Sequence, residues 1–266
     1  MNFSFIIINY RSLDFTRSCL NSLFEFLPTD KSWEIILIDN NSADGSAAKL
    51  SAEFKNRLTF IQNASNRGFA TANNQGAKIA QGRYLFFLNS DTEIKTNILP
   101  PLLSLFAAQT SVGIIAPLVL APNLKWQFGA CGRRQTLSSL LFQTTKINWH
   151  EAGLADYWTT DWVSGAALII RHDLFNKIGA WDENFFLYLE DTDLCFRIKK
   201  ANYKVAICPT VSLIHYGGQS PATSNERRRH YYLSQSYFFR KHYGRARASL
   251  MALIRWPYKT LILLKK

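Results

Sequence analysis

Polar residues of the types that bind nucleotides follow three short apolar runs of this sequence. Asn9-Tyr-Arg11 follows the first run, Asp39-Asn-Asn41 the second, and Asn89-Ser-Asp91 a later one. Carboxylates and amides at neighbouring strand ends can bind a base, a ribose and a divalent cation, which prefers oxygen ligands. The three clusters together favour a nucleotide site over polar residues that merely end strands.

The sequence has no glycine-rich motif for holding phosphates. Neither GxGxxG nor a Walker A sequence follows the first apolar run, and such motifs are what place phosphates on a helix N-terminus. The phosphates of a bound nucleotide must therefore be held another way, most simply by a metal ion on a carboxylate.

The clusters need a scaffold, and about the first hundred residues alternate between strand and helix patterns. Strands are expected at 3–9, 33–39, 58–62 and 84–88, with helices from 14, from 46 and over 68–80. The alternation predicts an α/β fold with a mostly parallel central sheet flanked by helices. Ligands bind such sheets beyond the carboxyl ends of the strands, where the three clusters lie.

The second half of the chain is less regular. Helices are expected at 98–107, after Asp173 and from about 185 to 201, with strands at 112–119, 166–170 and 203–208. Residues 121–160 are expected to form loops and short elements around a pocket. The chain thus divides into a first half, 1–95, a second half, 96–225, and a tail, 226–266.

The net charge of +12 is concentrated in the tail, which carries eleven Lys and Arg against one Glu. Helices are expected at 226–242 and 246–264. The second is a basic amphipathic pattern typical of helices that lie on an anionic membrane surface. A helix docked on the rest of the chain, or one that mediates a homodimer, would explain the same pattern. The nearly neutral body argues against nucleic-acid binding.

Composition indicates a folded protein without structural metal or disulfides. The four cysteines form no CxxC pair, which excludes a zinc ribbon and fits a reducing compartment. No run reaches the ~18 apolar residues of a spanning helix, and the first run is too short for a signal peptide. We expect a cytoplasmic protein, peripheral to the inner face of the membrane.

A series of short segments then carries a family resemblance. In order they are Ile6–Tyr10, Ile38–Ser46, Asn66–Ala70, Asn73–Gly76, Leu88–Thr92, Val163–Ala166, Gly179–Glu183, Glu190–Leu194 and His215–Gly218. Together they resemble the family 2 glycosyltransferases of the GT-A fold, in particular the rhamnosyltransferase-like enzymes of bacterial surface polysaccharide synthesis. The resemblance covers about residues 3 to 220 and leaves out the tail.

The resemblance implies that a nucleotide diphosphate sugar binds the first half and an acceptor the second. Asp39 resembles the aspartate that accepts a hydrogen bond from N3–H of uracil or thymine, and it could instead be a turn cap. The other implied donor-binding residues are Asn9, Tyr10, Asn41, Asn66, Gly68, Asn73, Asn89 and Ser90. The segment from Asn66 could equally be an ordinary helix cap.

The same resemblance implies a metal site and a general base. Asn89-Ser-Asp91 stands in the place of the family's DxD motif, with Asn89 replacing the first acid. Asp91 and His215 would bind Mg²⁺ or Mn²⁺, although a single His can be structural. Glu190 and Asp191 match the catalytic motif, with Asp191 as the base; acids that merely open a helix are the alternative.

Gly165, Trp181 and Asp182 resemble positions that border the sugar and the acceptor. Gly165 would let the backbone approach the ligand closely. Trp181 could stack on a sugar or lipid group, or it could pack in the core.

The implied activity is an inverting, metal-dependent sugar transfer, with L-rhamnose from dTDP-rhamnose as the best guess for the donor. The acceptor would be a glycan or a polyprenyl-diphosphate-linked glycolipid. A UDP-hexose donor, a nucleotidyltransferase and a non-catalytic glycan-binding protein are the alternatives. A nucleotidyltransferase should carry a basic, Gly-rich loop after the first strand, and Asn9–Leu13 contains no Gly.

Overall fold

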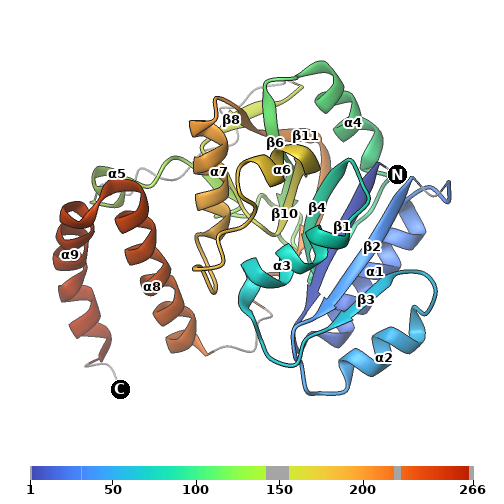
Figure 1. The fold of residues 1–266 in the computed structure, drawn as a ribbon, viewed down its shortest axis with the longest axis horizontal. Helices are drawn as coiled ribbons and strands as arrows, with labels where there is room; N and C mark the ends of the chain where they lie inside the picture. The colour runs from blue at the N-terminus through green and yellow to red at the C-terminus, as the bar shows by residue number, and fades with distance from the viewer. Residues whose placement is uncertain (1, 31, 142–155, 219–222, 264–266) are drawn as a thin grey trace.

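Among the residues that the structure describes, a nine-stranded sheet with helices on both faces forms the body of the protein (Figure 1). The computed structural model describes residues 2–30, 32–141, 156–218 and 223–263. The strand order is β3-β2-β1-β4-β10-β6-β11-β5, and β8 also pairs with β11. The α/β class and the flanking helices are therefore confirmed.

The first half folds as the alternation predicts. Its elements are β1 (Phe3–Asn9), α1 (Leu13–Phe26), β2 (Trp33–Asp39), α2 (Ser46–Glu53), β3 (Thr59–Gln62), α3 (Gly68–Ile79) and β4 (Tyr84–Asn89). The four strands are parallel. Asn9 is in register with Asp39, and Ile8 with Asn89. The register therefore places the three polar clusters at one edge of the sheet.

The second half adds antiparallel pairs to the sheet, which is therefore mixed, although most of its paired residues lie in parallel ladders. After β5 (Thr92–Ile94), which ends the first half, the chain forms α4 (Leu99–Ala108), β6 (Val112–Leu120), β7 (Cys131–Gly132), α5 (Leu137–Leu141), β8 (Trp158–Thr160), β9 (Trp162–Val163), β10 (Ala167–Arg171), α6 (His172–Lys177), α7 (Glu190–Lys200) and β11 (Lys204–His215). The chain enters β10 at the carboxyl edge of β4, where Asn89 N donates to Ala166 O at 2.9 Å. β10 must therefore run back antiparallel to β4, and it is also antiparallel to β6.

Strand β11 is longer than the expected strand at 203–208. It has twelve residues, and its pairing with β6 shifts register between Cys208 and Ser212. Pro209 and Thr210 interrupt the apolar pattern, which is why sequence periodicity ends the strand too early. The additional length pairs β11 with β5 and places His215 opposite Thr92.

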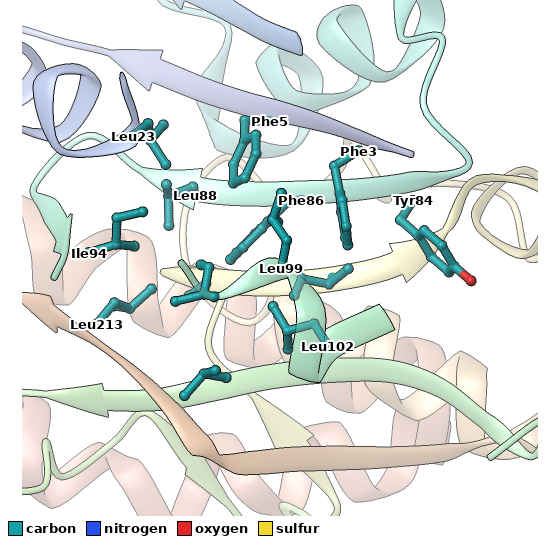
Figure 2. Packing of buried hydrophobic residues seen from close by; sticks show 14 of the residues in the cluster. Phe3, Phe5, Leu23, Tyr84, Phe86, Leu88, Ile94, Leu99, Leu102 and Leu213 are labelled. Carbon is teal, nitrogen blue, oxygen red and sulfur yellow. The ribbon is translucent and has the colours of Figure 1, made fainter. Parts of the chain in front are cut away.

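Two apolar layers cover the sheet. On one face, α1 and α4 pack on residues such as Phe5 and Phe86, as Figure 2 shows for Leu23, Leu99 and Leu102. On the other face, α3, α6 and α7 pack on residues such as Ile6 and Phe87. The alternation of Phe5 and Ile6 between layers follows from the two-residue period of a strand.

The C-terminal region forms two helices, α8 (Ser224–Tyr243) and α9 (Arg245–Leu263), which lie side by side (Figure 1). Thr223 and Glu226 form a capping box at the start of α8. A third apolar cluster joins Phe238 and Phe239 of α8 to Phe185 and Phe196 of the body and to Met251 of α9. At least α8 is thus docked on the rest of the chain. Within the described ranges, no helix combines the length and hydropathy needed to cross a membrane.

Candidate active site

A cavity of about 740 Å³ lies at the carboxyl edge of the sheet, within the size range of small-molecule sites. It is lined by a subset of the residues singled out from the sequence, namely Tyr10, Asn66, Gly68, Asn89, Ser90, Asp91, Gly165, Glu190, Asp191 and His215. Segments far apart in the sequence, from β1, β4, α3, α7 and β11, therefore meet around one space.

Asp91 and His215 face each other in the wall of this cavity. His215 Nε2 lies 3.2 Å from Asp91 Oδ1, and the Asn89 side-chain amide lies 3.3 Å from the same nitrogen. The backbone fixes the pair, because β5 and β11 are hydrogen-bonded neighbours and Tyr216 N donates to Asp91 O at 2.9 Å. Both side chains are mostly buried.

The donor set of this pair fits a divalent cation that is shared with a substrate. Asp91 offers a carboxylate, which both Mg²⁺ and Mn²⁺ prefer, and His215 offers an imidazole nitrogen, which the transition metal Mn²⁺ accepts more readily than Mg²⁺. The described residues contain no group of three or more His, Cys, Asp or Glu side chains that could hold a metal by themselves. A cation here would complete its coordination with phosphate oxygens and water, as Mg²⁺ usually does.

Asp191 lies in the first turn of α7, and two backbone N–H groups donate hydrogen bonds to its side chain. Its Oδ2 accepts from Gly165 N at 3.0 Å, and its Oδ1 accepts from Thr192 N at 2.6 Å. Burial raises the pKa of Asp191 although these hydrogen bonds lower it. A carboxylate with a raised pKa is a stronger general base than an ordinary one. Gly165, expected to border the ligand, therefore also orients the candidate base.

Glu190 is adjacent to Asp191 but differs in its surroundings. Its Oε2 is buried and has no hydrogen-bond partner among the described residues. Burial, and next the negative charge of Asp191, raise the pKa of Glu190 well above its usual range. Both carboxyl groups thus bind protons more tightly than carboxyl groups in water do. The Asp191 carboxyl group accepts two backbone hydrogen bonds, whereas Glu190 Oε2 accepts none from the described residues.

The loop before Glu190 has a strained backbone that neighbouring elements hold in place. Tyr188 and Leu189 have φ angles of 72° and 67°, which non-glycine residues rarely adopt. Phe69 N donates to Phe186 O at 2.9 Å, and Ser234 Oγ of α8 donates to Leu187 O at 2.8 Å. The loop is therefore positioned from both α3 and α8.

Asn9 and Asp39, which the resemblance places against the nucleotide base, lie behind the cavity wall. Both are fully buried and do not line the cavity. Asn9 Nδ2 donates to Asp39 Oδ1 at 2.7 Å and also to Ser42 and Ser46. Asp39 Oδ2 accepts from Ser42 N. These residues therefore organise the turn after β2, and a direct contact of Asp39 with a base stays a prediction.

Two other expected donor residues also lie off the cavity wall. Asn73 is buried in α3, where its side chain donates to Phe69 O. Asn41 is a turn residue with φ 63°. Asn40, which directly precedes Asn41, lines the cavity and donates to Asn66 Oδ1 at 2.9 Å.

Trp181 and Asp182 do not line the cavity either. Trp181 is 2% exposed and makes edge contacts with Phe87 and Phe175, so it is a core residue. Asp182 accepts from Lys241 Nζ at 2.7 Å and from the Tyr237 hydroxyl at 2.9 Å. Burial raises the pKa of Asp182, but these partners and Asn184 outweigh that effect and hold it at about 2. Asp182 therefore anchors α8.

Sequence reasoning missed the contribution of α8 to the cavity. Glu226, Arg227, His230 and Tyr231 line it, and the His230 ring stacks on Phe186. The family resemblance ends before residue 226, so the sequence did not predict that these side chains belong to the site. Arg227, His230 and Tyr231 are spaced at i, i+3 and i+4, which places them on one face of the helix. This spacing is the sequence feature from which their shared position could have been predicted.

Comparisons with known proteins agree with this architecture. The model of the family "Glycosyl transferase family 2" matches residues 4–179. N-acetylglucosaminyl-diphospho-decaprenol L-rhamnosyltransferase of Mycobacterium tuberculosis is 23% identical over 221 residues, 73% of this chain and 70% of that protein. Rhamnosyltransferase WbbL of Escherichia coli is 34% identical over 56 residues, 21% of each chain.

Solved glycosyltransferases share the fold. GalNAc-T7 with UDP, GalNAc and Mn²⁺ superimposes with a TM-score of 0.65 at 16% identity, covering 81% of this chain and 44% of that one. The mannosyltransferase PcManGT of Pyrobaculum calidifontis, in complex with GDP-Man and Mn²⁺, gives 0.63 at 17% identity over 90% of this chain and 64% of that one. The fold is thus of the GT-A type, and since the family model spans most of the α/β body, the chain belongs to glycosyl transferase family 2.

Proposed function

We propose that the chain transfers a sugar from a nucleotide diphosphate donor to an acceptor hydroxyl, with inversion at the anomeric carbon. The observation that supports this most directly is that the Asp91–His215 pair and Asp191 line the same cavity. The pair can hold a cation that would stabilise the leaving diphosphate, and Asp191 can accept the proton of the acceptor hydroxyl, which are the two functions that a single displacement would use here. A non-catalytic glycan-binding protein would need neither.

The roles of the residues follow from their chemistry. A divalent cation on Asp91 and His215 would supply positive charge to the leaving diphosphate. Asp191 takes the proton of the acceptor hydroxyl as that oxygen bonds to the anomeric carbon, and the bond from this carbon to the diphosphate oxygen breaks. The attack comes from the face opposite the diphosphate, so the configuration inverts.

L-Rhamnose from dTDP-rhamnose is the proposed donor, and a glycan or polyprenyl-diphosphate-linked glycolipid is the proposed acceptor. The name of the mycobacterial relative, a rhamnosyltransferase acting on a diphospho-decaprenol substrate, supports this choice. A UDP-hexose is the rival donor, because GalNAc-T7 was solved with UDP.

A thermal-shift screen of dTDP-, UDP- and GDP-sugars, with and without Mn²⁺ or Mg²⁺, tests donor and cation together. A ligand present at about 100 times its Kd stabilises the fold by about 2.7 kcal/mol, so the correct donor should raise Tm, and more so with the cation. If no nucleotide sugar shifted Tm under either condition, the proposal would fail.

The base assignment is tested by Asp191→Asn. We expect this variant to keep the donor-induced shift in Tm and to lose about 10²- to 10⁴-fold in turnover. Asp173→Asn is a matched control, because Asp173 also opens a helix and its Oδ1 accepts from Leu174 N at 2.8 Å. Near-normal turnover by Asp191→Asn would remove Asp191 as the base.

We also infer that α9 binds the anionic inner surface of the membrane. Leu250 and Leu253 are 48% and 68% exposed, and the exposed Arg245 and Arg247 precede them on the same helix. Apolar side chains beside cations are the composition of an interfacial helix. The arrangement would bring a lipid-linked acceptor to the enzyme, and a homodimer through the same face is the rival explanation.

A further inference from the structure

Gln127, on the segment after β6, makes two hydrogen bonds to His215. Its side-chain Nε2 lies 3.1 Å from the His215 carbonyl oxygen, and its Oε1 lies 2.7 Å from His215 Nδ1. Gln127 N donates to Val119 O at 3.1 Å, which ties the segment to the sheet. Gln127 does not line the cavity, so its side chain can affect the site through its two hydrogen bonds to His215.

The backbone contact fixes which end of the Gln127 amide faces the ring. A carbonyl oxygen only accepts hydrogen bonds, so the atom facing His215 O must be the amide nitrogen. The amide oxygen therefore faces Nδ1, and because an amide oxygen also only accepts, Nδ1 must carry a hydrogen. In the neutral ring the lone pair is then on Nε2.

Nε2 is the ring atom that faces the candidate cation site. It lies 3.2 Å from Asp91 Oδ1 and 3.3 Å from the Asn89 amide nitrogen. The other neutral tautomer would place a hydrogen on Nε2 and remove its capacity to ligate a metal. A hydrogen bond from the far nitrogen of a metal-binding His normally sets both tautomer and ring orientation.

Gly217, two residues after His215, has no side chain that would crowd the Gln127 amide. Gly217 has φ +62°, and a Cβ there would lie 3.3 Å from Gln127 Nε2. No third His, Cys, Asp or Glu of the described residues joins Asp91 and His215 in a metal-binding group, so the imidazole is one of two candidate ligands of these types.

We propose that Gln127 is a positioning residue that presents His215 Nε2 to the divalent cation and thereby increases metal affinity. The proposal rests on the metal-dependent function proposed above. The experiment below distinguishes a failure of that function from a failure of the role proposed for Gln127.

The test compares Gln127→Leu and Gln127→Glu in the full chain. Mn²⁺ is titrated calorimetrically into protein saturated with dTDP or UDP, whichever the wild type binds. Gln127→Leu should lower Mn²⁺ affinity about 10- to 100-fold, the usual effect of losing such a partner. Gln127→Glu keeps an acceptor for the Nδ1 hydrogen and should restore most of that loss. Gln109→Leu is the control, because the Gln109 side chain accepts from the Tyr157 hydroxyl, away from the site.

Two outcomes would overturn the inference: unchanged Mn²⁺ affinity in Gln127→Leu, or an equal loss in the Leu and Glu variants, which indicates a merely structural role. If the wild type bound no Mn²⁺ at all, the proposed metal-dependent function would fail instead, and the inference with it.

A second measurement is made on the wild-type protein and needs no Gln127 variant. The ¹⁵N chemical shifts of the His215 ring, in wild-type protein without metal, report which ring nitrogen carries a hydrogen. The signal is assigned by its loss in His215→Gln, since the chain has five histidines. We expect a hydrogen on Nδ1, because the Gln127 amide oxygen that faces this nitrogen only accepts hydrogen bonds. The reverse tautomer would overturn the inference.

Discussion

His242 of α8 and Asp193 of α7 lie 2.7 Å apart, from Nε2 to Oδ1, and both side chains are almost completely buried. Arg197 and Lys241 also bind this carboxylate, at 2.8 and 2.6 Å. Burial raises the pKa of Asp193, but the partners, His242 first among them, outweigh it and lower the pKa below its usual value. Helix α8 is thus fastened to α7 at Asp193, two residues beyond the candidate base Asp191.

This contact predicts that His242→Ala lowers both stability and turnover. A hydrogen bond to a charged group contributes about 1.5–3 kcal/mol, and 1 kcal/mol corresponds to about 2–4 °C in Tm for a chain of this size. Thermal unfolding should therefore show a loss of several degrees. Arg240→Ala, an exposed neighbour on α8, should leave Tm nearly unchanged. Equal Tm values for both variants would show that the contact does not fasten α8.

Glu190→Gln should stabilise the protein at high pH. The folded-state pKa of Glu190 lies above its unfolded value because of burial and the charge of Asp191. The folded protein thus binds this proton more tightly, and the stability present below the unfolded pKa is lost as pH rises through the folded pKa. Each tenfold difference in proton affinity between the folded and unfolded states corresponds to about 1.4 kcal/mol.

The measurement is Tm of wild type and Glu190→Gln across pH. The variant should exceed the wild type at about pH 8 and approach it near pH 4, below the unfolded pKa. A difference that did not change with pH would contradict the ionisation argument and indicate a packing effect alone.

Gly68→Ala should displace the loop that precedes Glu190. Gly68 has φ +79°, and a Cβ there would lie 2.6 Å from Phe186 O, closer than any tolerable contact. We expect a loss of more than about 1 kcal/mol and a fall in turnover.

Gly179→Ala is the matched control for this change. Gly179 has φ +87°, and a Cβ there would have no neighbour within 4 Å. Alanine at this position therefore has the same backbone strain, about 1–2 kcal/mol, without the clash. Its turnover should stay near that of the wild type. If both variants lost turnover equally, backbone strain rather than the approach of the loop would be responsible.

The double change Leu250→Glu and Leu253→Glu should release the protein from anionic vesicles. Each buried Leu contributes about 1.5–3 kcal/mol, and the added charges oppose an anionic surface. Sedimentation with phosphatidylglycerol vesicles measures the bound fraction. Leu124→Glu is the control, since Leu124 is 66% exposed but lies in the turn after β6. Binding equal to the wild type would exclude this face as the membrane surface.

The local pattern of residues was sufficient to predict the first half of the fold and the edge where the site lies. Apolar runs and helix signals are properties of neighbouring residues, so β1 to β4 and the helices between them follow from the chain itself. Parallel pairing then places Asn9, Asp39 and Asn89 at one edge. Asp91 and Asp191 could be chosen as candidates because their motifs are continuous in sequence.

Which side chains actually reach the cavity was decided by packing between distant segments. His215 meets Asp91 only because β11 continues past an irregularity to pair with β5. Asn9 and Asp39 turn inward because Ser42 and Ser46 provide nearby partners, and Trp181 is enclosed by Phe87 and Phe175. α8 joins the wall because its aromatic face is buried against α7. Periodicity specifies which face of an element is apolar, whereas the partner of that face is chosen by the free energy of the whole chain.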